Sequence, residues 1–144
     1  MIEKDTVRLL RECDAGVNMG VKSIDDVLKY VTSDKLYTLL SDSKDEHERI
    51  RSDINEMLRS YDDEGKHPNP IASGMSYIKT NFKLAVKESD KTIADLMTDG
   101  CNMGVKSLSK YLNEYEAADE RSKDVAKKLI AAEEQLAVNI REFL

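Results

Sequence analysis

His47 and Glu133 are the residues of the sequence with the clearest chemistry for a buried polar site. Each falls at helical spacing on the apolar stripe of a segment that is predicted to be a helix. A carboxylate inside a helical core is costly unless it is paired, protonated, hydrated or bound to a ligand. His47 is the natural partner for Glu133, so the favoured interpretation is a buried hydrogen-bonded pair that fixes the register of two helices.

The same side chains allow a second interpretation, a weak metal site. Asp14 flanks the apolar stripe of the first predicted helix and would supply a third ligand beside His47 and Glu133. Zinc and iron need three or four ligands that converge on one point. The alternative to a structural pair is therefore an iron or zinc site formed by these three residues, whereas the favoured interpretation expects no cofactor.

No residue is predicted to be catalytic. The sequence has two histidines, no nucleophile elbow and no glycine-rich phosphate loop after a strand, so acid–base and phosphoryl-transfer chemistry have little to work with. Cys13 and Cys101 lack the C-x-x-C spacing of redox and zinc sites, and each lies among apolar neighbours. We interpret both cysteines as buried thiols in a reducing compartment.

A hexapeptide, Asn-Met-Gly-Val-Lys-Ser, occurs at residues 18–23 and again at 102–107. In each copy another glycine stands four residues earlier, which pairs Gly16 with Gly20 and Gly100 with Gly104. Glycine inside a helix costs about 1 kcal/mol of stability relative to alanine, so we expect the packing at these four positions to require a residue without a side chain. We interpret the glycines as patches where two helices approach closely. Two methionines beside them, Met19 and Met103, would be covered by another helix or would form a partner surface.

Apolar spacing predicts helices at about residues 5–32, 35–62, 89–115 and 122–143, with an additional helix within 71–88. The turns near 33 and 116–121 are short, so consecutive helices form antiparallel hairpins. The hexapeptide repeats at an offset of 84, and Ile54 to Leu58 matches Ile140 to Leu144 at an offset of 86. We therefore predict a duplicated hairpin, 5–62 and 89–144, joined by a crossover at 63–88, in which the first helix meets the third and the second meets the fourth.

The composition indicates a helical protein with a single domain over residues 1–144. Hydrophobic residues make up 40% of the chain and charged residues 35%, and the formal net charge is −6. Without a basic patch, binding to nucleic acid or to an anionic membrane is not expected. No apolar run approaches the ~20 residues that cross a bilayer, so we expect a cytoplasmic protein.

Three features of the sequence resemble the uncharacterised bacterial ferritin-like four-helix-bundle family. They are the hairpin layout, the linker Gly65-Lys66-His67-Pro68-Asn69-Pro70 with the helix predicted after it, and the helix start Lys91 to Leu96. The resemblance implies an all-α, ferritin-like bundle with one long crossover. Some proteins of the wider ferritin-like group bind two irons through Glu and Glu-x-x-His motifs. This sequence departs from that pattern, since Lys44 stands three residues before His47 and the last predicted helix has no histidine.

We therefore expect a non-enzymatic cytosolic bundle protein with a structural or partner-binding role, its partner a second copy or another protein. The alternative function is a ferritin-like metal-binding protein with a degenerate site.

Overall fold

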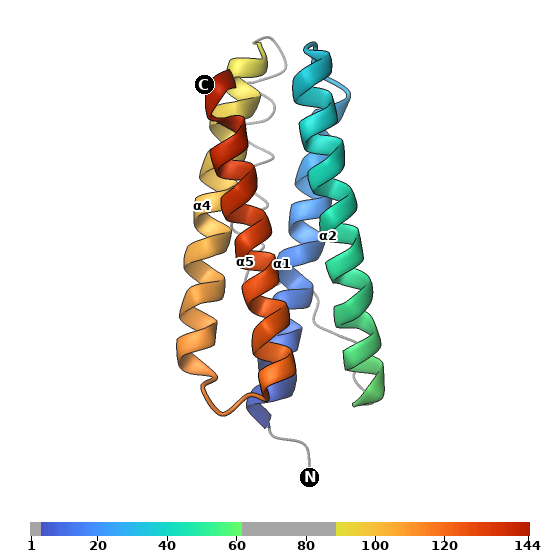
Figure 1. Cartoon of the computed structure of the whole chain (residues 1–144), viewed down its shortest axis with the longest axis vertical. Helices are drawn as coiled ribbons and strands as arrows, with labels where there is room; N and C mark the ends of the chain where they lie inside the picture. The colour runs from blue at the N-terminus through green and yellow to red at the C-terminus, as the bar shows by residue number, and fades with distance from the viewer. Residues whose placement is uncertain (1–3, 62–88) are drawn as a thin grey trace.

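The computed structural model describes residues 4–61 and 89–144, and within these ranges the chain forms four long helices and no strand (Figure 1). The helices are α1 (Lys4–Leu28), α2 (Asp34–Ser60), α4 (Asp90–Glu114) and α5 (Glu120–Asn139), and a 3₁₀ turn, η1 (Ile140–Phe143), ends the chain. The predicted all-α four-helix class is confirmed. The predicted crossover at 63–88, with its additional helix, lies outside the described residues.

Side-chain caps begin two of the helices. At the start of α2 the Ser33 hydroxyl accepts a hydrogen bond from the Leu36 N–H at 3.2 Å. At the start of α5 the Asp119 carboxylate accepts one from the Ser122 N–H at 2.8 Å. Each cap satisfies a backbone donor that would otherwise have no partner in the first turn, which fixes where the helix begins.

Each helical hairpin packs as an antiparallel pair, and the two pairs lie side by side. In Figure 1 the turn between α1 and α2 lies at the top of the bundle and the turn between α4 and α5 at the bottom. Within the described residues α1 contacts α4, α2 contacts α5, and α1 also contacts α5 across the middle. The expected neighbours, first helix with third and second with fourth, are therefore in contact, and α2 and α4 occupy opposite corners.

The apolar core is divided into two clusters that lie toward opposite ends of the bundle. One contains Leu10 and Ile54, and the other contains Ile24 and Leu40, all of them fully buried or nearly so. Each helix contributes to one cluster with its first part and to the other cluster with its second part, and a short segment of the helix lies between the two parts. Gly20, His47, Gly104 and Glu133 occupy these four segments. The helical positions of greatest chemical interest thus meet at one level, halfway along the bundle.

Each hairpin turn is held by the first helix of the other hairpin. The Asp90 carboxylate of α4 accepts hydrogen bonds from the Thr32 and Ser33 N–H groups at 2.8 and 2.9 Å. The Thr6 hydroxyl of α1 accepts one from the Asp119 N–H at 2.8 Å. Thr6 and Asp90 are 84 positions apart, and Ser33 and Asp119 are 86 apart. The residues of the two contacts are therefore related by the same offsets as the repeated sequence motifs.

Two predicted boundaries need correction. The first helix ends at Leu28 and not at residue 32, because Tyr30 and Val31 already donate to carbonyls three residues earlier and the next two N–H groups are taken by Asp90. The last helix tightens to a 3₁₀ turn from Ile140, so it does not continue as an α-helix to residue 143. None of the described helices has an apolar stretch long enough to cross a membrane.

Replacement of Asp90 by alanine is expected to lower the free energy of unfolding by about 1–2 kcal/mol, because two backbone donors of the α1–α2 turn lose their acceptor. Burial raises the pKa of Asp90, but the hydrogen bonds from Thr32 and Ser33 outweigh it and the pKa is lowered overall. This contribution is present above the ordinary pKa of an aspartate and is lost as the pH falls through the lowered value. Denaturant unfolding at pH 7 and below pH ~3 measures it.

Asp95, exposed on the same helix, gives the matched control Asp95→Ala. Equal effects of the two substitutions at pH 7 would show that the contact from Asp90 to the turn contributes nothing.

Candidate functional site

His47 and Glu133 meet in the middle of the bundle as a hydrogen-bonded pair. The His47 Nε2 atom lies 2.8 Å from Glu133 Oε1, and the His47 side chain is 1% exposed. The other ring nitrogen, Nδ1, lies 2.7 Å from the Ser43 carbonyl oxygen one turn earlier in α2. The imidazole is therefore held at both nitrogens, which fixes its orientation within the core.

The hydrogen bonds define how many protons the pair carries. The Ser43 carbonyl can only accept, so Nδ1 carries a proton. The contact between Nε2 and Oε1 then needs a further proton, held either by an imidazolium or by a carboxylic acid. Burial lowers the pKa of His47, but the hydrogen bond and negative charge of Glu133 and the Ser43 carbonyl outweigh it, so the pKa is raised above 6.5. An imidazolium–carboxylate pair is the form that this shift favours.

Cys101 completes the surroundings of the carboxylate. Its thiol forms a hydrogen bond to Glu133, and burial together with the charge of Glu133 raises the pKa of Cys101 far above its ordinary value. Burial also raises the pKa of the Cys13 thiol to about 12, assisted by Glu12 and Asp14. Both thiols therefore stay protonated at neutral pH, which makes them poor nucleophiles and poor metal ligands.

Gly20 and Gly104 both lie against this pair, but at different distances. A Cβ atom on Gly20 would lie 2.9 Å from His47 Cδ2, 3.2 Å from its Nε2 and 3.3 Å from Glu133 Oε1. A Cβ atom on Gly104 would lie 3.6 Å from the carboxyl carbon of Glu133, an ordinary van der Waals distance. The two equivalent glycines of the repeated hexapeptide therefore differ, since only Gly20 stands where a methyl group would strike the buried pair.

The interpretation of the glycines as points of close approach between helix backbones needs correction. The nearest atoms to Gly16, Gly20 and Gly104 belong to side chains: Leu108 and Leu129 beside Gly16, His47 and Glu133 beside Gly20, and Glu133 alone beside Gly104. At Gly20 the absent side chain makes room for His47 and Glu133, which enter from α2 and α5. The sequence showed that small residues were needed but not which groups filled the space.

The glycines of α1 and α4, together with Glu133, line a common cavity of about 210 Å³, which we call the α1–α4 groove. From α1 it is lined by Glu12, Gly16, Met19, Gly20, Ser23 and Val27. From α4 it is lined by the six residues found 84 positions later, Leu96, Gly100, Met103, Gly104, Ser107 and Tyr111, together with Met97, Cys101 and Leu108. Met103 is 40% exposed and Ser107 is also exposed, so the groove reaches the surface.

Asp14 does not join His47 and Glu133. Its carboxylate is buried and accepts a hydrogen bond at 3.3 Å from Asn18 of the same helix. Within residues 4–61 and 89–144 no group of three or more His, Cys, Asp or Glu side chains is placed to hold a metal ion. The predicted three-ligand set of His47, Glu133 and Asp14 is therefore not assembled, and the Asp14 carboxylate is instead hydrogen-bonded to Asn18, four residues along its own helix.

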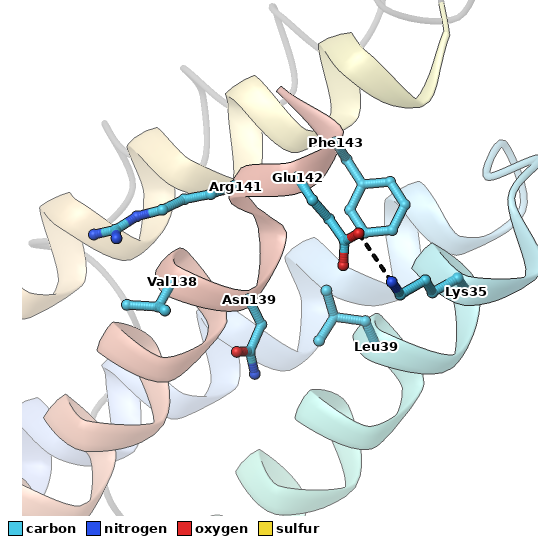
Figure 2. A pocket seen from close by; sticks show the side chains of 7 residues that line it. All are labelled: Lys35, Leu39, Val138, Asn139, Arg141, Glu142 and Phe143. Carbon is cyan, nitrogen blue, oxygen red and sulfur yellow. Dashed lines mark hydrogen bonds and ion pairs between the residues drawn. The ribbon is translucent and has the colours of Figure 1, made fainter.

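A second hollow lies at the end of the bundle, between α2 and η1 (Figure 2). The Lys35 ammonium and the Glu142 carboxylate form an ion pair there at 2.9 Å, with apolar contributions from Leu39, Val138 and Phe143. The two charged side chains are 71% and 53% exposed, so the ion pair is solvated and contributes little to stability. No buried polar group points into this hollow among the residues that line it, and we do not assign it a function.

Sequence reasoning missed Cys101, Glu12 and Tyr111 as parts of the site. The Tyr111 hydroxyl forms a hydrogen bond to Glu12, which places a second buried carboxylate on the wall of the α1–α4 groove. The offset of 84 was an available signal, because Tyr111 and Cys101 are the counterparts of Val27 and Val17 on the apolar stripe of the first helix.

The chain matches no protein-family model, no curated protein and no solved structure.

Replacement of the two hexapeptide glycines by alanine is expected to have different effects on stability. Gly104→Ala should stabilise the protein by up to ~1 kcal/mol, because alanine favours the helix and the new methyl group meets only ordinary contacts. Gly20→Ala should be less stable than Gly104→Ala by about 1–3 kcal/mol, the usual cost of overpacking, because the ring of His47 is fixed at both nitrogens. Thermal or denaturant unfolding of both variants measures the difference. Equal stabilities would mean that Gly20 does not make room for the pair.

Proposed function

We propose that this chain is a ferritin-like bundle made of two copies of one helical hairpin. Three sets of corresponding positions support the duplication. The α1–α4 groove is lined by residues that correspond at an offset of 84, the turn contacts of Thr6 and Asp90 correspond, and His47 bonds to its own counterpart at an offset of 86. In a twofold arrangement a position that meets its own equivalent lies on the axis, which is where the His47–Glu133 pair would lie.

The function that we propose is non-enzymatic: the bundle binds a helix of a protein partner, or of a second copy, in the α1–α4 groove. The observation that carries this proposal is the composition of the groove. Glycines and methionines from both helices line it, and it reaches the surface at Met103 and Ser107. Glycine allows a helix to approach closely, and the flexible methionine side chain adapts to apolar partners of varied shape.

The chemistry of the buried groups supports a binding role over catalysis. Both cysteines have raised pKa values, and His47 is fixed between Ser43 and Glu133 with no exposed nitrogen. A general base needs a free lone pair within reach of substrate, and an activated thiol needs a lowered pKa. The pair is better suited to fix how the two hairpins pack than to transfer protons.

The metal-binding alternative has support from two of its three predicted ligands. His47 and Glu133 converge, but zinc or iron would need at least one further protein ligand. Elemental analysis of the purified protein, with His47→Ala as control, separates the alternatives. Stoichiometric iron or zinc that is lost in the variant would replace the binding role proposed above.

The binding role is tested by blocking the groove at a position whose own side chain is small and exposed. Ser107→Arg places a long charged side chain on the groove wall, and Ser52→Arg places the same change on the exposed face of α2. Self-association is measured by sedimentation velocity, and partner binding by titration with the purified protein that copurifies from cell extract. We expect Ser107→Arg to weaken the association at least about tenfold, or 1.4 kcal/mol, and Ser52→Arg to leave it unchanged. An association equally strong in both variants, or none in the full chain, contradicts the proposal.

A further inference from the structure

We propose that the α1–α4 groove is a binding site for a soft monovalent metal ion, Cu(I), held by the thioether sulfur atoms of its methionines. Met19, Met57, Met97 and Met103 are the methionines that the structure describes, and all of them except Met57 line this cavity. The inference goes beyond the helix-binding role proposed above, because it concerns the sulfur atoms inside the groove. It is also separate from the zinc or iron alternative, which has no methionine ligand.

The chemistry of thioethers favours Cu(I) over harder ions. Thioether and thiolate sulfur are soft ligands that select Cu(I), whereas imidazole and carboxylate groups suit zinc and iron. A thioether has no proton to lose, so methionine binds a metal without the deprotonation that the raised pKa of the Cys101 thiol makes costly. Within the described ranges no set of three His, Cys, Asp or Glu side chains competes for a harder ion.

Met19 and Met103 lie at the same level on the two walls of the groove. Each comes immediately before a glycine of the repeated hexapeptide, Gly20 or Gly104. Cβ atoms on these glycines would lie 3.3 Å from Glu133 Oε1 and 3.6 Å from its carboxyl carbon, so both glycines flank the same carboxyl group. The three rotatable bonds of a methionine side chain allow both thioethers to turn toward one ion between the walls.

The rest of the cavity suits a buried cation. Met97 is 6% exposed and supplies a third thioether from the buried side of α4. A buried cation needs negative charge nearby, and the described lining includes the carboxyl groups of Glu12 and Glu133 but no lysine or arginine. Met103 is 40% exposed, which gives the ion a path from solvent to the cavity.

The inference is tested by anaerobic titration of the full-length protein with Cu(I), in competition with a chromophoric Cu(I) chelator. We expect one ion per chain. Met19→Leu and Met103→Leu should each weaken binding at least about tenfold, because leucine preserves the apolar volume and removes the sulfur atom. Met57→Leu is the matched control and should leave the affinity unchanged, since Met57 is buried in one of the apolar clusters and does not line the groove.

NMR spectra of the methionine methyl groups locate the ion residue by residue, because Cu(I) is diamagnetic. The methyl signals of Met19, Met97 and Met103 should shift when Cu(I) is added, and the signal of Met57 should not. Unchanged thermal unfolding of the metal-free leucine variants shows that any loss of binding is not a loss of fold.

The inference fails if the chain binds no Cu(I), or if the affinity is the same in the unaltered chain and in both groove variants. An equal loss of affinity in Met57→Leu would also contradict it. Binding that is lost in Cys101→Ser or Cys13→Ser, but kept in the methionine variants, would assign the ion to a thiol and overturn the inference. Each of these failures is distinct from failure of the helix-binding role, which is measured by association of the chain and not by its metal content.

Discussion

The bundle is organised around a polar pair in a place where polar groups are costly. An unpaired carboxylate or imidazolium in an apolar core costs several kcal/mol, and removal of one partner from a buried ion pair typically costs 3–5 kcal/mol. His47 and Glu133 avoid this cost only if α2 and α5 are held in a single register, with the two side chains 2.8 Å apart. The helix next to them must then leave room, and Gly20 does so. The pair thus constrains three helices at once.

The same constraint accounts for the division of the core and for the groove. On either side of the pair the four helices bury apolar clusters, and at its level α1 and α4 carry glycines where large side chains would otherwise meet. The reciprocal contacts of Thr6 and Asp90 with the opposite hairpin turns fix the two ends of the bundle. With the ends and the centre defined, the glycines line the α1–α4 groove between these two helices.

Much of this arrangement can be predicted from the sequence, and the features that cannot be predicted depend on contacts between distant residues. The periodicity of apolar residues predicts the four helices, and the presence of His47 and Glu133 on apolar stripes predicts that they are buried and paired. The end of α1 at Leu28 was missed because it depends on Asp90, a residue 62 positions away. The role of Gly20 was missed for the same reason: helical spacing identifies the face on which a glycine lies, but only the packing of the helices determines that an imidazole lies opposite it.

The central claim, that Gly20 exists to admit the His47–Glu133 pair, is tested most directly by a double-mutant cycle between positions 20 and 47. The free energy of unfolding is measured for the Gly20→Ala substitution in the unaltered chain and again in a His47→Ala background. If the ring of His47 is the obstacle, the cost of Gly20→Ala should disappear in that background and be replaced by the small gain that alanine brings to a helix. A cost that is the same in both backgrounds would contradict the account.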